Sequence, residues 1–132
     1  MKIFITMTFN ESKNKAEVEH LSSLVKSSGF EDFCFIRDIE NYQKVFSNSK
    51  DLMVSAKNEI NNCDALLIDM TKKPTGRAIE AGIAFAKNKK IIVIMQKGTN
   101  IKDTVKGIAD LIIEYDKLED IVKPLNSYLK KI

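Results

Sequence analysis

The fold is decided by the stretch CDALLIDMTKKPTGRAIEAGIAFAKNKKIIVIM, residues 63–95. Two dense apolar runs, residues 65–69 and 91–95, flank a stripe of small and apolar residues with helical spacing over 79–86. Continuous apolar runs rich in Ile and Val are typical of strands covered on both faces, as in a parallel sheet. The stretch therefore predicts a strand–helix–strand unit with two parallel strands.

The same alternation continues on both sides of this unit. Further strands are predicted at residues 2–7, 33–36 and 111–113. Apolar residues recur at helical spacing over residues 18–25, 52–63 and 118–129. Gly29 is expected as the C′ residue of the first helix, and Pro124 indicates a kink or a fresh helix start. Residues 41–48 are interpreted as a loop or partial helix.

Strict strand–helix alternation predicts one domain over residues 1–132. The expected fold class is α/β, with a doubly wound, mainly parallel five-stranded sheet and helices on both faces, flavodoxin-like or Rossmann-like.

Composition narrows the class of protein. The net charge is +3, and 44% of the residues are hydrophobic. No apolar run approaches the roughly 20 residues of a membrane span, and no signal peptide precedes the first strand, so a cytoplasmic protein without a membrane partner is expected. The lysine clusters are interspersed with acids and lack interleaved aromatic residues, which argues against a nucleic-acid polymer as partner.

Several cofactor and metal chemistries lack their motifs. Cys34, Cys63 and the single His20 do not have metal-ligand spacing, so no metal site is predicted. The chain contains neither G-x-G-x-x-G after the first strand nor G-x-x-x-x-G-K-[ST]. A receiver-type phosphoacceptor site would need an acidic cluster beyond the first strand, where only Glu11 stands.

Ligands of such sheets bind beyond the carboxyl ends of the strands. This rule selects four loops, at residues 8–12, 37–42, 70–77 and 96–99. The third loop contains Pro74 and Gly76 and opens a helix whose free amides favour an anion, either a phosphate or a carboxylate. Gly76 would allow the backbone to approach a ligand closely.

Glu80 is the only charged residue in the stretch 78–86. The helical wheel puts it on the flank of the buried face, at the mouth of the expected cleft. A carboxylate there suits a nucleophile toward an electrophilic carbon, or an anchor for a sugar. The alternative interpretation is a first-turn glutamate that caps the helix or complements its dipole.

Other polar residues at the strand ends are weaker candidates. Asp69 leaves the third strand toward the expected ligand, whereas Arg37 and Asp38 either reach the cleft or pair with each other. Asn10 and Ser12 follow the first strand and suit ligand binding or helix capping equally well.

Four segments together resemble a known family over nearly the whole chain. They are MKIFI at 1–5, CDALLIDMT at 63–71, GRAIEAGIA at 76–84 and NKKIIV at 88–93. The order and spacing of these segments resemble those of the nucleoside 2-deoxyribosyltransferases and of the related 2′-deoxynucleoside 5′-phosphate N-hydrolases.

The resemblance implies cleavage or exchange of the N-glycosidic bond of a nucleoside or its 5′-monophosphate, with Glu80 as the nucleophile and without a cofactor. It implies a small-molecule nucleoside or nucleotide as partner, and a homo-oligomer in which neighbouring subunits complete the sites. The residues expected to line the sugar and phosphate site are Thr8, Phe9, Asn10, Asp38, Asp69, Thr71, Thr75, Gly76 and Arg77.

Two positions depart from the family pattern. Ala56 and Pro74 stand where members of the family usually carry aspartates that position or protonate the leaving base. Asp38 or Asp69 could substitute for them. The second hypothesis is therefore a nucleotide-binding module that retained the fold and lost catalysis.

Overall fold

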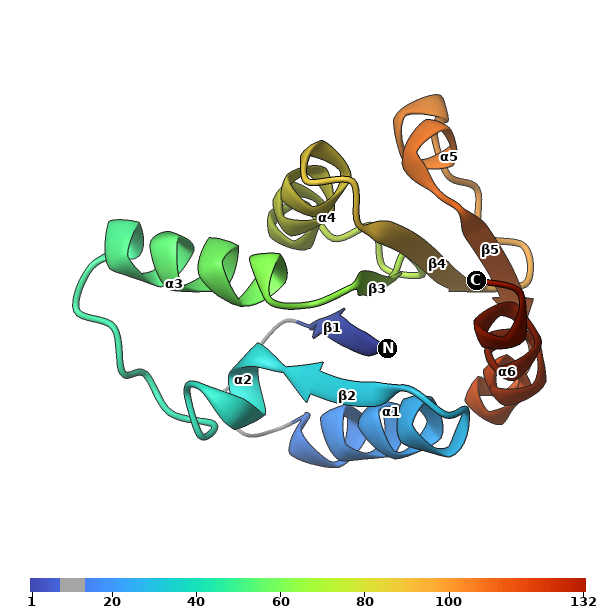
Figure 1. Cartoon of the computed structure of the whole chain (residues 1–132), viewed down its shortest axis with the longest axis horizontal. Coiled ribbons are helices and arrows are strands. Elements are labelled where there is room, and N and C mark those ends of the chain that lie inside the picture. Colours follow the sequence, from blue (N-terminus) through green and yellow to red (C-terminus); the bar gives the residue numbers. More distant parts are fainter. Residues whose placement is uncertain (8–13) are drawn as a thin grey trace.

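The computed structural model describes residues 1–7 and 14–132, and its centre is a sheet of five parallel strands (Figure 1). The strands lie in the order β2-β1-β3-β4-β5. Their bounds are β1 Lys2–Thr6, β2 Glu31–Cys34, β3 Ala65–Asp69, β4 Lys90–Gln96 and β5 Leu111–Tyr115. The predicted α/β class with a doubly wound parallel sheet is confirmed.

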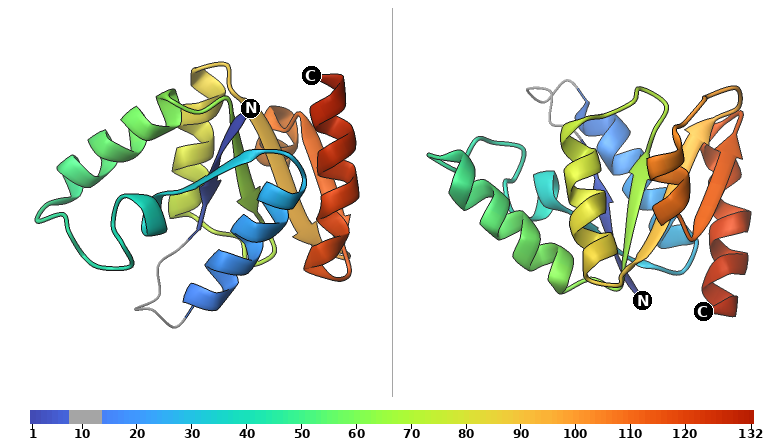
Figure 2. Two further views of the ribbon diagram at one scale, coloured as in Figure 1. Left: turned by 60° about the horizontal axis from the view of Figure 1, so that its bottom comes forward. Right: turned by 90° about the horizontal axis from the view of Figure 1, so that it is seen from above.

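Helices cover both faces of the sheet (Figures 1 and 2). Their bounds are α1 Lys15–Ser27, α2 Phe35–Asp38, α3 Ser49–Asn61, α4 Gly76–Ala86, α5 Asp103–Ile108, the 3-10 helix η1 Leu118–Ile121 and α6 Val122–Lys131. Leu21 of α1 and Leu125 of α6 belong to one core layer, whereas Ile60 of α3 and Ala84 of α4 belong to the other. The sheet thus lies between two apolar layers.

The dense apolar runs follow from this double cover. Along β3, Leu66 and Ile68 enter the layer under α3 and α4, while Leu67 enters the layer under α1 and α6. Successive side chains of a strand point to opposite faces, so a strand covered on both faces is apolar at nearly every position before its carboxyl end.

Strand β2 ends at Cys34 rather than at the predicted Ile36. Phe35 and Ile36 are buried as expected, but they begin the short helix α2. The backbone N–H of Cys34 donates to Asp38 Oδ2 at 2.9 Å. This hydrogen bond joins the last residue of β2 to the last residue of α2, where the chain leaves the sheet. An apolar run alone does not distinguish a strand from a buried turn, because both hide the same side chains.

Strand β5 extends beyond the predicted residues 111–113 because it is an edge strand. Ile113 and Tyr115 are buried, whereas Ile112 and Glu114 between and beside them are exposed. This alternation is the pattern of a strand with one solvated face, and a search for continuous apolarity finds only its first part.

Two expected helix boundaries, at Gly29 and near Pro124, are confirmed. Helix α1 ends at Ser27, and Gly29 follows with φ of +103°. Helix α6 begins at Val122 directly after η1, so Pro124 lies in its first turn, where a missing N–H breaks no helical hydrogen bond. Residues 41–48 form a loop, in which Asn41 and Tyr42 have positive φ.

The strand order reverses beside β1, which pairs with β2 on one side and β3 on the other. The helices that follow β1 and β3 lie on opposite faces, with α1 on one and α4 on the other. Such a reversal is where ligands bind in open α/β sheets. Among the described residues, no helix is long and apolar enough to cross a membrane.

Gly29→Ala is expected to lower the free energy of unfolding by about 1–3 kcal/mol, because alanine does not tolerate a φ of +103°. The added Cβ would also lie 2.9 Å from Leu129 Cδ2, so that side chain must shift. Urea denaturation measures the change. Gly107→Ala is the control, because its Cβ meets nothing within 4 Å in helix α5 and should stabilise the protein. Equal effects of the two substitutions would contradict this account.

Candidate active site

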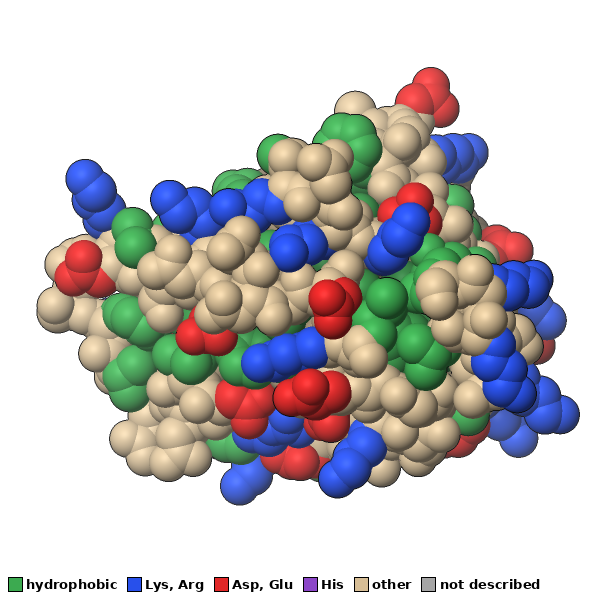
Figure 3. Space-filling model, viewed as in Figure 1, with side chains coloured by type: hydrophobic (Ala, Val, Ile, Leu, Met, Phe, Trp, Pro, Cys, Tyr) green, Lys and Arg blue, Asp and Glu red, His purple; other side chains and the backbone are tan. Residues whose placement is uncertain are grey.

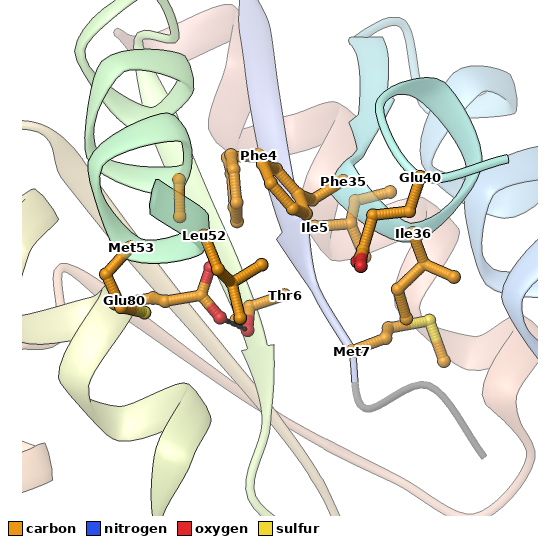
Figure 4. Close-up of a pocket in the computed structure, with 11 residues that line it drawn as sticks. Phe4, Ile5, Thr6, Met7, Phe35, Ile36, Glu40, Leu52, Met53 and Glu80 are labelled. Carbon is orange, nitrogen blue, oxygen red and sulfur yellow. Dashed lines mark hydrogen bonds between the residues drawn. The ribbon is translucent and has the colours of Figure 1, made fainter. Parts of the chain in front are cut away.

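A cavity of about 260 Å³ opens at the carboxyl end of β1 (Figure 4). Strand β1, the α2 segment, α3 and α4 each contribute to its wall. The lining residues are Phe4, Ile5, Thr6, Met7, Phe35, Ile36, Glu40, Leu52, Met53, Ala56 and Glu80. Most are apolar, and an apolar wall with a few polar groups is typical of a small-molecule site.

Glu80 projects from α4 into this cavity toward the end of β1 (Figure 4). The hydroxyl of Thr6, the last residue of β1, donates a hydrogen bond to Glu80 Oε1 at 3.0 Å. Helix α4 begins at Gly76 and has no acidic residue in its first turn, so Glu80 does not cap it. The carboxylate is thus fixed by the neighbouring strand rather than by its own helix.

Burial raises the pKa of Glu80 from its ordinary value of 4.5 to about 7. The hydrogen bond from Thr6 and the charge of Arg77 act in the opposite direction, and the charge of Glu40 raises the pKa further. Near neutral pH both protonation states of Glu80 are therefore populated.

Aromatic rings form one wall of the cavity. The ring centroids of Phe4 and Phe35 lie 6.4 Å apart, and Phe46 stacks on Phe35 with a centroid distance of 5.9 Å. Hydrophobic side chains also reach the surface between α3 and the segment after α2 (Figure 3). This wall offers an apolar, aromatic surface against which a planar ring can pack.

Asp69 and Thr71 form a hydrogen-bonded network at the start of the β3–α4 loop. The Thr71 hydroxyl donates to Asp69 Oδ1 at 2.6 Å, and the Tyr115 hydroxyl donates to Asp69 Oδ2 at 2.6 Å. The N–H of Gln96 donates to Thr71 Oγ1 at 3.0 Å. Burial, together with Asp69, raises the pKa of Tyr115 to about 12. These contacts tie the loop to β4 and β5, and neither Asp69 nor Thr71 lines the cavity.

Thr75, Gly76 and Arg77 lie at the beginning of α4. Arg77 is half-buried, and its Nε is buried without a hydrogen-bond partner among the described residues. Burial lowers the pKa of Arg77, whereas the charges of Asp69 and Glu80 raise it. Its guanidinium thus lies within electrostatic range of the candidate nucleophile.

Asp38 is engaged by its own segment. Its carboxylate accepts hydrogen bonds from Arg37 Nε and Arg37 Nη2, each at 2.9 Å, besides the one from Cys34 N–H. Arg37 also forms an ion pair with Asp32 at 3.0 Å. The sequence left open whether Arg37 and Asp38 pair, and in the structure they do. Glu40, two residues further on, lines the cavity instead.

Sequence reasoning did not single out Thr6 or Glu40. Thr6 was hidden inside a strand, and Glu40 was one of several polar residues in a selected loop. The only available signal was that Thr6 ends β1 and that Glu40 lies in the segment after β2, both near the reversal point. Thr8, Phe9, Asn10 and Ser12 lie outside the described residues. In the described part of the chain, no three His, Cys, Asp or Glu side chains are grouped to hold a metal ion.

Comparison with known families identifies the family of this chain. The pattern of the nucleoside 2-deoxyribosyltransferases matches residues 6–123, which include Thr6, Glu40 and Glu80. The chain belongs to the nucleoside 2-deoxyribosyltransferase family. No curated protein sequence matches it significantly.

Solved structures share the fold of this family member. A CMP N-glycosidase from Clostridium botulinum is 21% identical, with a TM-score of 0.72 over 97% of this chain and 99% of that one. A 2-deoxyribosyltransferase from Bacillus psychrosaccharolyticus is 17% identical, with a TM-score of 0.68 over 92% and 90%. A conserved protein from Enterococcus faecalis V583 is 12% identical, with a TM-score of 0.77 over 96% and 98%.

The raised pKa of Glu80 predicts a pH-dependent effect of Glu80→Gln on stability. A carboxyl whose folded-state pKa of about 7 exceeds its unfolded value stabilises the fold at low pH and loses this contribution as the pH rises. The variant should therefore gain stability relative to the native protein between about pH 4.5 and pH 7. Urea denaturation from pH 4 to pH 8 measures this difference. Glu114→Gln, at an exposed position of β5, is the control and should show no such trend. A pH-independent effect of Glu80→Gln would contradict the assignment.

Proposed function

We propose that this family member cleaves or exchanges the N-glycosidic bond of a (deoxy)nucleoside or its 5′-monophosphate, with Glu80 as the nucleophile. The observation that carries this proposal is the Glu80 carboxylate, held by Thr6 inside a mostly apolar cavity at the strand reversal. A partly buried carboxylate beside an electrophilic sugar carbon suits two-step displacement.

In the proposed reaction, a Glu80 carboxylate oxygen forms a bond with the anomeric carbon as the bond to the base breaks. Water or a second base then displaces Glu80 from the sugar. The hydrogen bond from Thr6 and the charge of Arg77 favour the ionised carboxylate that the first step needs. The aromatic wall is suited to hold the planar base.

The remaining predicted binding residues keep their proposed roles around this centre. Thr75, Gly76 and Arg77 at the start of α4 would hold the sugar or a 5′-phosphate, because free helix amides and a guanidinium both attract anions. Asp69 and Thr71 would contribute to binding indirectly, because their hydrogen bonds hold the β3–α4 loop in shape. Thr8, Phe9, Asn10 and Asp38 are proposed to contact the substrate as it enters from the β1 and β2 loops. The buried free Cys34 and Cys63 fit the reducing cytoplasm proposed for the protein.

A second candidate function is nucleotide binding without catalysis. Ala56 lines the cavity and is buried, so the position at which the family usually carries an aspartate offers no acid here. Binding of a nucleotide measured by calorimetry, without any release of base, would favour this function.

Glu80→Ala is expected to abolish turnover while the protein stays folded. Wild-type and variant protein are incubated with a panel of nucleosides and 5′-monophosphates, with and without a second free base, and the products are separated by chromatography. Loss of at least about 10³-fold is expected, because the variant lacks the attacking group. Free base indicates a hydrolase, and an exchanged nucleoside indicates a transferase. A variant that retains most of its activity would refute Glu80 as nucleophile.

We further propose that the protein forms a homo-oligomer through the outer surface of α3 and α4. Three large apolar side chains are exposed on these two helices: Val54 at 43%, Ile79 at 58% and Phe85 at 52%. A groove lined by Met53, Val54 and Ile83, among others, runs along the same helices. Large exposed apolar side chains on adjacent helices are typical of interaction surfaces.

Phe85→Glu is expected to reduce the molar mass in solution, because it places a charge in the proposed interface. Size-exclusion chromatography with light scattering measures the mass. Ile112→Glu, at an exposed apolar residue of the edge strand β5, is the matched control and should leave the mass unchanged. A native protein that is already monomeric would exclude the proposed interface.

A further inference from the structure

Glu40 enters the cavity from the side opposite Glu80 (Figure 4). Its backbone is fixed at the end of α2, where the Glu40 N–H donates to the Phe35 carbonyl at 3.1 Å. The next two residues, Asn41 and Tyr42, adopt positive φ, and the Tyr42 N–H donates to the Ile36 carbonyl at 2.8 Å. The backbone of Glu40 is therefore held on both sides by the α2 turn.

The carboxylate of Glu40 has no structural task in the described part of the chain. No hydrogen bond or ion pair to it is formed there, in contrast to Asp38, which accepts bonds from Cys34 and Arg37. The residue is half-buried, and burial raises the pKa of its carboxyl group. A carboxyl group of this kind is available to a ligand and more readily protonated than one in water.

Glu40 and Glu80 are the two carboxylates that line the cavity as described. Their charges interact, since Glu40 contributes to the raised pKa of Glu80. The side chains of Leu52 and Thr6 lie between them (Figure 4). Two carboxyl groups on opposite sides of a substrate-sized space are the arrangement that glycosidic bond cleavage uses, one as nucleophile and one as acid and base.

We propose that Glu40 is the general acid and base of the reaction whose nucleophile is Glu80. This inference rests on the proposed function and deepens it. It assigns the proton transfer to a residue after β2. Position 56 of α3, where the family usually carries an aspartate, is alanine here and cannot transfer a proton. A general acid in the cavity benefits substrates whose base is a poor leaving group unless it is protonated.

Each step of the proposed reaction balances. In the first, a Glu80 oxygen bonds to the anomeric carbon, and the electrons of the carbon–nitrogen bond pass to the base. In the reactive form Glu80 is ionised and Glu40 is protonated, and Glu40 gives its proton to the base, which leaves neutral. In the second, the Glu40 carboxylate takes a proton from water, or from the ring nitrogen of an acceptor base. The deprotonated oxygen or nitrogen attacks the anomeric carbon and releases Glu80.

The test compares two deoxyribosyl donors with Glu40→Gln, which keeps the shape of the side chain and removes its proton. One donor carries an unmodified purine, and the other carries the N7-methylated purine, which leaves neutral without protonation. A 4-nitrophenyl deoxyriboside replaces the methylated donor if the native enzyme does not accept it. Glu114→Gln is the control for loss of an exposed carboxylate, and circular dichroism checks that each variant is folded.

Glu40→Gln should lose about 10²-fold or more in kcat/KM on the unmodified donor. On the activated donor, release of base in a single turnover should stay within a few-fold of the native rate. Equal losses on both donors, or no loss on either, would overturn the role of Glu40. Glu80→Ala should be inactive on both, so a failure of the nucleophile proposal is distinguishable. A native enzyme inactive on every donor would refute both proposals.

Discussion

The hydrogen bond from Thr6 to Glu80 joins two elements that are 74 residues apart in the sequence. It depends on the strand order, because β1 and β3 lie side by side while α1 and α4, the helices after them, cover opposite faces. This divergence leaves space beyond the carboxyl end of β1, and α4 brings Glu80 to its border. The cavity, the perturbed carboxylate and the aromatic wall all follow from this reversal.

Burial of charge sets the chemistry of this space. Glu80 is deep enough for its pKa to reach about 7, and the charge of Glu40 adds to the rise. Thr6 and Arg77 counteract the rise, so the carboxylate is neither fully ionised nor permanently protonated at neutral pH. The surrounding apolar side chains make these electrostatic effects stronger than they would be in water.

The departures from the family pattern acquire a physical interpretation in this arrangement. An acid at position 56 would project from α3 into the cavity, and here alanine leaves that wall apolar. Glu40 approaches the same space from another element, after β2. A proton donor needs only to reach the leaving group, so a site can obtain it from a different strand end without a change of fold.

The sequence by itself determined the sheet, its helical layers and the candidate nucleophile. The bounds of β3 were predicted to the residue, because turn-rich segments delimit its apolar run, and Glu80 was visible as the single charge in an apolar stretch. The end of β2 and the length of β5 were not predicted. A buried turn has the same apolar sequence as a strand, and an edge strand alternates between buried and exposed residues. Only the tertiary structure placed Thr6 against Glu80, turned Asp38 toward Arg37 and brought Glu40 into the cavity. The direction of a side chain depends on how separate elements pack, and local patterns do not encode that packing.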